Sequence, residues 1–243
     1  WNGSDTFSRP LRWLLAMHGE HHIPFTALNV ASGSTTRLLR NSASGPDPAE
    51  VKDPAHHAEL LAQDTIEIDF ATRRSSIWAS AVELAAEVNG VVPESAGEDG
   101  GLIDEVVNLV ESPTPILGGF DPAFLELPKE VLVMVMRKHQ RYFPVEDPKT
   151  GDLLPHFVTV ANGAVDPDAV RAGNESVLKA RYEDAKFFYE ADTRKTLEEF
   201  KPQLEGITFQ TELGTMLEKT ARVEKLAPKL AASLGFSEAD ADV

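Results

Sequence analysis

The chain has 243 residues, a formal net charge of −16 and no cysteine, which excludes disulfides and thiolate metal sites. Its hydrophobic and charged fractions, 42% and 26%, are ordinary for a globular protein with a substantial core. No apolar run approaches the roughly 20 residues that span a bilayer. The net acidity argues against sequence-independent coating of nucleic acid, but salt screening lets a local basic patch act within about 8 Å. Because the chain opens on Trp1 with no signal-peptide pattern, we interpret it as a mature product or an internal segment.

The first 70 residues predict short elements separated by loops. Pro10 suits a first helical turn and Gly19 suits a helix end, so the apolar residues between them indicate a helix. A stretch rich in Pro, Ser and Asp predicts a loop, and apolar residues that alternate with polar ones predict a half-buried strand. The expected order is a helix over 10–19, an extended segment over 22–30, a loop over 42–57, a helix over 58–63 and a strand over 65–70.

Helical and extended patterns alternate in the middle of the chain. Amphipathic stretches predict helices, and a turn signal between two apolar segments predicts a hairpin. The expected elements are helices over 71–90, 102–111 and 129–139, a short strand over 113–120, and a hairpin that pairs 141–146 with 153–160.

Helical patterns dominate from residue 166 onward. The predicted helices cover residues 167–172, 175–192, 196–204 and 211–230. We therefore predict an α+β fold with two parts, an α+β module over 1–164 and a helical region over 165–243.

Recognised catalytic signatures are missing from the sequence. It contains no GxxxxGK[ST] loop, no GxGxxG, no GxSxG and no HExxH. The adjacent pairs His21-His22 and His56-His57 lack the spacing of metal ligands and are interpreted as surface histidines. No two carboxylates form an evident acid/base couple, so we assign no catalytic, cofactor-binding or metal-binding residue.

A basic cluster follows the third predicted helix of the middle region and consists of Arg137, Lys138, His139 and Arg141. Cations at a helix C-terminus complement the macrodipole by about 0.3–1 kcal/mol, which accounts for Arg137 and Lys138. Arg141 falls past the helix, where we expect it to share a strand face with Phe143. A cation beside exposed aromatic side chains is typical of a surface for phosphates and bases. A helix end and a nucleic-acid contact are both open interpretations.

The long helix predicted over 175–192 carries Arg181 on its apolar stripe, between Leu178 and Ala185. Asn174 is the expected N-cap. A buried arginine needs a partner, and Asp184 at i+3 is placed to supply one. The pattern indicates a core helix with an internal ion pair, and an Arg181 that faces a substrate is the alternative.

Six stretches, in this order, resemble the β subunit of bacterial-type glycyl-tRNA synthetase, and together they cover nearly the whole chain. Each would be weak alone, but six in sequence are specific. The variant resembles the plant and algal organellar form, in which α and β regions are fused. Residues 35–44 depart from the Gly-His-Arg run usual in bacterial relatives. The stretches are FSRPLRWLLAMHG, DEVVNLVESPTPILGGF, FLELPKEVLVMVMRKHQRYFPV, LLPHFVTVANG, GNESVLKARYEDAKFFYEADTRK and GITFQTELGTMLEKTARVEKLA.

The resemblance implies a B3/B4-like α+β module followed by helical hairpins that begin the downstream helical domains. In this family ATP and glycine are activated on the α region, a class II core absent from these residues. ATP and Mg²⁺ are therefore expected in the parent enzyme and no cofactor in this segment. In this family the β region holds and orients tRNA. The resemblance therefore implies that the candidate tRNA-binding residues are Arg137, Lys138, His139, Arg141 and Arg181.

The implied partners are tRNA-Gly, the α region and a second copy, as a homodimer of fused chains or an α2β2 assembly, with no membrane. The implied location is the chloroplast or mitochondrion, with the bacterial cytoplasm as the alternative. The sequence thus predicts a non-catalytic, tRNA-binding section of glycine–tRNA ligase. One alternative is a hydrolytic editing module, which needs a pocket where Thr, His or Glu converge. Another is an intersubunit scaffold, whose signature is a large apolar surface patch.

Overall fold

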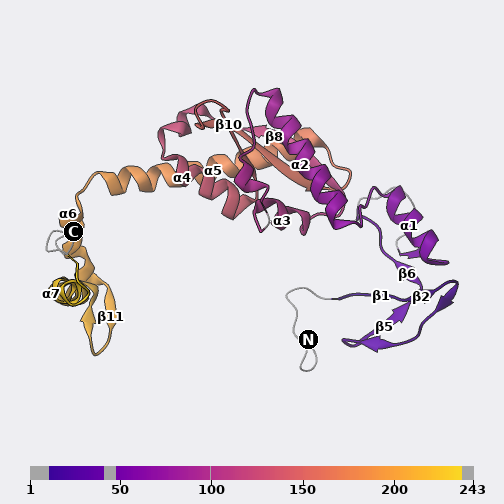
Figure 1. The fold of residues 1–243 in the computed structure, drawn as a ribbon, viewed down its shortest axis with the longest axis horizontal. Helices are drawn as coiled ribbons and strands as arrows, with labels where there is room; N and C mark the ends of the chain where they lie inside the picture. Colours follow the sequence, from indigo (N-terminus) through magenta and orange to yellow (C-terminus); the bar gives the residue numbers. More distant parts are fainter. Residues whose placement is uncertain (1–10, 41–47, 99, 237–243) are drawn as a thin grey trace. The chain divides into compact units, whose positions relative to one another are not determined.

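The computed structural model describes residues 11–40, 48–98 and 100–236 (Figure 1). By its contacts the chain divides into two compact units, Trp1–Asp184 and Ala185–Val243. The predicted α+β class is confirmed. The boundary near residue 164 and the B3/B4 likeness stay predictions. No helix among the described residues is both long and apolar enough to cross a membrane.

A three-stranded antiparallel sheet forms the centre of the first unit, in the order β8 (Pro113–Gly119), β10 (Leu153–Asn162) and β9 (Phe143–Glu146). The predicted hairpin is confirmed, because β9 and β10 pair antiparallel with an irregularity between Leu153 and Phe157. Phe157 stands opposite Gly118 on β8 and Pro144 on β9. The middle strand thus carries a fully buried ring between a glycine, which has no side chain, and a compact proline.

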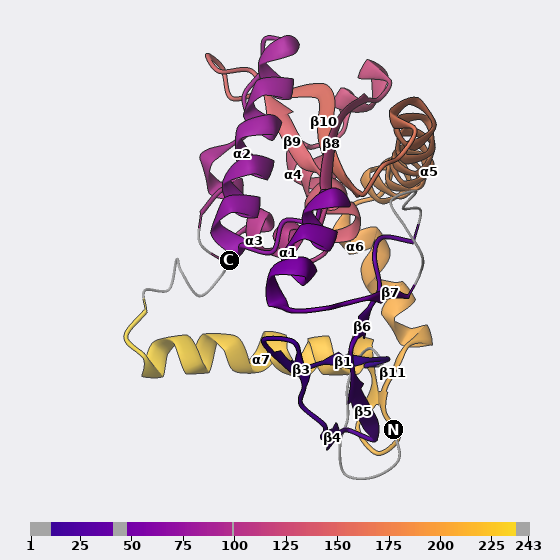
Figure 2. The same ribbon diagram turned by 90° about the vertical axis from the view of Figure 1, so that its right-hand side faces the viewer.

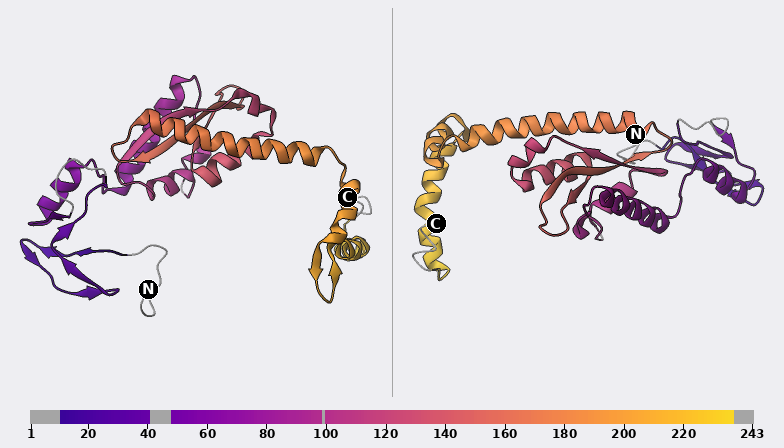
Figure 3. Two further views of the ribbon diagram at one scale, coloured as in Figure 1. Left: turned by 180° about the vertical axis from the view of Figure 1, so that it is seen from behind. Right: turned by 90° about the horizontal axis from the view of Figure 1, so that it is seen from above.

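Helices α2 (Phe70–Glu87) and α3 (Leu102–Val107) supply the rest of this core, much as predicted. Ile77, Ala81 and Ala85 recur every four residues on one face of α2 and are fully buried. The short alanines allow the helix to approach β8 and β10, whose residues it contacts. Figures 2 and 3 show α2 on one side of these strands and the N-terminal part of α5 (Pro167–Thr193) on the other.

An ion pair joins α2 to α3. The guanidinium of Arg74 donates to Asp104 Oδ1 at 2.8 Å and to the carbonyl of Gly97 at 2.6 Å. Two hydrogen bonds lower the pKa of Asp104. The bond from Arg74 has the larger effect, and the bond from the Gly100 amide has the next largest. Two short 3-10 turns, η1 (Glu94–Ala96) and η2 (Pro122–Glu126), and the short helix α4 (Lys129–Met134) complete this region.

The helix predicted over 10–19 is wrong for the residues that the structure describes. Short strands stand there instead, including β2 (Met17–His18) and β3 (His21–His22). Gly19, which the sequence suggested as a helix end, has φ = +57° in the two-residue turn of this hairpin. The remaining strands of the section are β1 (Leu14–Leu15), β4 (Thr26–Ala27), β5 (Val30–Gly33), β6 (Thr35–Thr36) and β7 (Ala49–Glu50).

Two further predictions in this section need correction, and residues 41–47 of the predicted loop lie outside the described residues. Helix α1 (Pro54–Gln63) begins four residues before the predicted start at 58, because Asp53 caps it by accepting the amide of His56 at 2.8 Å. The strand predicted over 65–70 does not form. Ile68 is 61% exposed, so the alternating pattern that suggested a half-buried strand belongs to a solvent-facing connection into α2.

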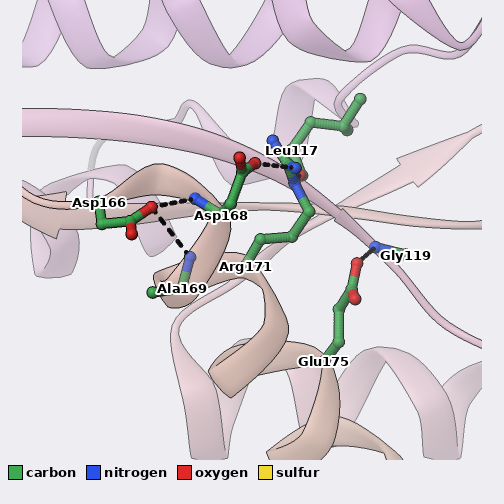
Figure 4. A network of polar contacts seen from close by, with 7 residues as sticks. All are labelled: Leu117, Gly119, Asp166, Asp168, Ala169, Arg171 and Glu175. Carbon is green, nitrogen blue, oxygen red and sulfur yellow. Dashed lines mark hydrogen bonds and ion pairs between the residues drawn. The ribbon is translucent and has the colours of Figure 1, made fainter.

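Helix α5 is continuous from Pro167 to Thr193, although the sequence predicted two helices separated by an N-cap at Asn174. Asn174 lies inside the helix, and its side-chain amide donates to the carbonyl of Val170. The helix is fastened to the edge strand β8 by two side chains (Figure 4). Arg171 donates to the carbonyl of Leu117 at 2.8 Å, and Glu175 accepts the amide of Gly119 at 2.8 Å.

The second unit contains α6 (Leu197–Phe200), the turn η4 (Lys201–Gly206), the hairpin of β11 (Thr208–Gln210) and β12 (Gly214–Thr215), and α7 (Met216–Ser233). The helices expected over 196–204 and 211–230 are present in outline, and the hairpin between them was not predicted. Thr196 and Thr215 each begin a helix with a capping box. No side chain of this unit is buried in the part of the chain that the structure describes.

Two glycines test this packing in opposite directions. A Cβ built on Gly118 would lie 2.5 Å from the nearest atom of the Phe157 ring, whereas one on Gly173 in α5 meets nothing within 4 Å. We expect Gly118→Ala to destabilise the protein by about 1–3 kcal/mol through overpacking. Gly173→Ala should stabilise it by about 0.5–1 kcal/mol, because glycine inside a helix is unfavourable relative to alanine. Thermal unfolding measures both, and a neutral Gly173→Ala would contradict a continuous α5.

Candidate nucleic-acid interface

The basic cluster lies where a helix changes its winding and stops. Helix α4 continues into a π-helical turn, η3 (Val135–Gln140), which ends at Arg141 in the left-handed conformation with φ = 59°. The amide of Tyr142 donates to the carbonyl of Met136 at 2.9 Å and closes the turn. In this turn Lys138 and His139 are exposed, whereas Met136 is fully buried in the core.

Arg141 does not lie on a strand, and this prediction is wrong. Strand β9 begins two residues later, and Phe143 is fully buried rather than exposed beside the cation. Arg141 instead folds back over the helix end, with its guanidinium 2.6 Å from the carbonyl of Lys138 and 3.2 Å from Glu105 Oε2. Both side chains of this ion pair are about half exposed, 43% for Arg141 and 57% for Glu105, so its net stabilisation is small.

A cavity of about 580 Å³ lies beside this cluster. Arg137 and Lys138 contribute its cationic side chains, and Glu105 and Glu130 contribute carboxylates. Together with Arg141, three cations face two carboxylates here, in a chain whose net charge is −16. The neighbourhood is therefore much less acidic than the chain as a whole, which favours the approach of an anion. The lining residues are Gly100, Gly101, Leu102, Glu105, Glu130, Val133, Met134, Arg137 and Lys138.

The buried ring of Tyr142 anchors the cluster to the fold. It stacks on Phe157 with ring centroids 4.6 Å apart and an interplanar angle of 15°. Its hydroxyl donates to Oδ1 of Asn174 on α5 at 2.5 Å. Burial raises the pKa of Tyr142 to about 12. The residue next to Arg141 is thus held on one side by the sheet and on the other by α5.

Arg181 lies apart from this cavity and is exposed, as is Asp184. The interpretation of a core helix with an internal ion pair between these residues is therefore wrong. The buried face of α5 is carried by Leu178 and Tyr182, whose hydroxyl reaches the carbonyl of Leu132 at 3.3 Å. Within the described part of the chain, the side chain of Arg181 has neither a hydrogen bond nor an ion pair, and its candidacy for tRNA binding stays a prediction.

A second cavity, of about 680 Å³, lies where β8, β10 and α5 meet. It brings His156 from β10 next to Glu175 and Ser176 of α5, residues that no sequence motif linked. Glu175 is oriented by the Gly119 amide. The complete lining is Gly119, Phe120, Asp121, Pro122, Pro155, His156, Ala172, Glu175, Ser176 and Lys179.

The histidine pairs occupy different environments, although the sequence suggested that all four face solvent. His21 and His22 are exposed on β3, where Nε2 of His22 lies 3.0 Å from the hydroxyl of Ser32. His56 accepts the amide of Lys52 through Nδ1 at 3.2 Å. His57 is half-buried and lines a third cavity, and this burial lowers its pKa.

Comparison with known proteins identifies the family. A family model described as the glycyl-tRNA synthetase beta subunit matches residues 1–242. Glycine–tRNA ligase, chloroplastic/mitochondrial 2, of Arabidopsis thaliana is 46% identical over 240 residues, which are 98% of this chain and 22% of that protein. The glycine–tRNA ligase beta subunits of Listeria monocytogenes serotype 4a and Bacillus subtilis are 41% and 42% identical over 99% and 98% of this chain.

The chain therefore belongs to the glycyl-tRNA synthetase beta subunit family, as its sequence motifs predicted. It spans about a third of the length of the bacterial relatives and about a fifth of the Arabidopsis protein.

The anchoring role of Tyr142 predicts a pH dependence. Because its pKa rises from about 10 in an unfolded chain to about 12, the folded state holds the phenolic proton more tightly. This contribution to stability is complete below about pH 10 and is lost as the pH rises through about 12. Tyr142→Phe lacks the titrating group, so its free energy of unfolding should fall less than the wild-type value between about pH 9 and 11.

Urea denaturation at several pH values measures this difference. The exposed Tyr189 provides the matched control, and Tyr189→Phe should follow the wild-type profile. A Tyr142→Phe profile parallel to the wild type would contradict the prediction.

Proposed function

We propose that this chain is a non-catalytic, tRNA-binding section of glycine–tRNA ligase. The parent reaction joins glycine to tRNA-Gly through an adenylate and uses ATP and Mg²⁺ on the α region. The observation that carries the proposal is the basic cluster 137–141 beside a cavity, in a chain that is otherwise acidic. Membership of the beta subunit family and the names of the relatives as glycine–tRNA ligases support it.

The cluster suits the phosphate backbone of a folded RNA. Arg137 and Lys138 line the cavity, and the guanidinium of Arg141 bonds to Glu105 and to the carbonyl of Lys138, two residues of that lining. A phosphate that approaches Arg141 competes with the carboxylate of Glu105. The ion pair between Arg141 and Glu105 is weak because it is exposed to solvent, so the phosphate can displace the carboxylate. The net negative charge of the chain disfavours phosphate binding elsewhere, so the phosphate contacts concentrate at this cluster.

The proposed partners are tRNA-Gly, the α region of the synthetase and a second copy of the ligase, as a homodimer of fused chains or an α2β2 assembly. The proposed location is the chloroplast or mitochondrion, since the Arabidopsis relative is named for these compartments, with the bacterial cytoplasm as the alternative.

The exposed apolar residues of α7 support an additional role in holding parts of the enzyme together; they are Val223, Leu226 and Leu230.

A hydrolytic editing module is the second candidate function. The convergence of His156, Glu175 and Ser176 on the second cavity favours it, because an imidazole and a carboxylate are groups that activate water. Two contacts disfavour it. Glu175 already accepts the amide of Gly119, and the hydroxyl of Ser176 already donates to the carbonyl of Ala172 at 2.8 Å. The first contact fastens α5 to β8, and the second lies within α5 itself.

Arg141 provides the test of the phosphate surface. In the intact ligase, Arg141→Gln should weaken tRNA-Gly binding and reduce the slope of log affinity against log salt by about 0.7–0.9, because one phosphate contact is lost. Glu105→Gln should have the opposite effect on affinity, since it removes the competing carboxylate. Lys149→Gln, which alters an exposed cation in the turn between β9 and β10, is the matched control. Unchanged affinity and salt slope in Arg141→Gln would show that the cluster is only a helix end.

The proposal also predicts that the second cavity performs no chemistry. His156→Ala and Glu175→Gln in the intact ligase should leave glycine-dependent pyrophosphate exchange unchanged. They should also leave the hydrolysis rate of misacylated tRNA-Gly unchanged. Loss of hydrolysis with normal exchange in both variants would instead identify an editing site.

A further inference from the structure

The N-terminal section of the first unit contains a third cavity that the proposed function does not use. It has a volume of about 330 Å³ and lies among the β1 segment, strand β6, the end of β7 and helix α1. Its lining combines an indole, an imidazole and aliphatic side chains: Trp13, Leu15, Met17, Thr36, Val51, Pro54 and His57. This volume is at the lower end of the range for small-molecule pockets, about 300–1,000 Å³, so a single planar ring system fits it better than a longer ligand.

The aromatic walls are open to a ligand. Trp13 is 41% exposed, so part of its indole is accessible to a ligand. The guanidinium of Arg37 lies 5.9 Å from the centroid of the Trp13 ring. An indole with a guanidinium beside it is the surface on which unpaired nucleobases stack.

The polar groups of the cavity suit the edge of a base. Burial lowers the pKa of His57, which favours a neutral imidazole with one donor and one acceptor nitrogen. The Thr36 hydroxyl, on a side chain that is only 5% exposed, can donate or accept. Two groups that each donate and accept can pair with the hydrogen-bonding edge of a nucleobase, which a purely apolar occupant would leave unused.

The charge of this section also favours nucleic acid. Residues 11–57 contain four basic and four acidic residues, so the section is neutral within a chain whose net charge is −16. Five of the seven histidines lie there as well. A nucleotide therefore meets less electrostatic repulsion at this cavity than over most of the chain.

We propose that the cavity beside Trp13 binds one unpaired nucleobase of the tRNA by stacking it on the indole. This inference rests on the proposed function, since it names a second contact with the same partner. The contact differs in kind from the one at the basic cluster. Stacking involves no phosphate, so its loss weakens binding without altering the dependence on salt.

The test measures binding of tRNA-Gly to the intact ligase across a salt series. Trp13→Leu should weaken binding about ten-fold or more with an unchanged salt slope, because one stacked base is lost. Trp13→Phe keeps a ring and should retain most of the affinity. Phe25→Leu is the matched control, because Phe25 is 45% exposed in the same section and does not line the cavity.

The outcomes separate this inference from the proposed function. If Trp13→Leu binds as tightly as Trp13→Phe while Arg141→Gln reduces the salt slope, the base pocket is wrong and the phosphate surface stands. If both variants bind normally, both ideas fail. If Trp13→Leu lowers the melting temperature of the free ligase and leaves tRNA affinity intact, the cavity seats protein rather than a base, which also overturns the inference.

Ultraviolet crosslinking of the wild-type ligase to tRNA-Gly gives a reading that needs no variant. Peptide mapping should find a nucleotide attached to the peptide that contains Trp13 or to the one that contains His57. Attachment only to peptides outside residues 11–57 would overturn the proposal.

Discussion

The buried ring of Phe157 is the contact on which the rest of the first unit depends. On one side it lies against Gly118, where even a methyl group would collide with it, and on the other it stacks on Tyr142. Tyr142 in turn reaches Asn174 on α5 and stands directly after Arg141. One ring in the middle strand therefore fixes the sheet, the long helix and the end of the basic cluster together. A shift of this ring would move Tyr142, and with it the adjacent Arg141, relative to α5.

The elements that could be predicted from the sequence are those with strong local signals. Helix α2 has a regular apolar face, and the hairpin of β9 and β10 has a clear turn between two apolar segments. The failures have physical causes. A glycine with positive φ, such as Gly19, can either end a helix or form the turn of a hairpin. Here the strand pairing of Met17 with His22 selects the hairpin. Asn174 is a good N-cap by type, but here its side-chain amide donates to the Val170 carbonyl one turn earlier, and the helix continues through it.

Only part of the candidate site could be predicted from the sequence. The cluster of cations at 137–141 is visible in the sequence, but the carboxylate that partly neutralises it is not. Glu105 is 36 residues away from Arg141, and only the fold brings the two together. Likewise, nothing in the spacing of Trp13, Thr36 and His57 indicates that they line one cavity. For Arg181 the prediction of a helix was right, but the residue was assigned to the wrong face of it. The buried ring of Tyr182, next along the helix, takes the inward position and turns the arginine to solvent.

The way α5 is fastened to β8 limits how other chains can join this sheet. A sheet edge normally offers a row of free carbonyls and amides on which an extended peptide can add as a further strand. Here the side chains of Arg171 and Glu175 already occupy the Leu117 carbonyl and the Gly119 amide (Figure 4). At the opposite edge, Val91 pairs with Glu146 and shields the four-residue β9. Strand addition is therefore obstructed at both borders of the sheet, which leaves helical faces and loops as the surfaces for recognition.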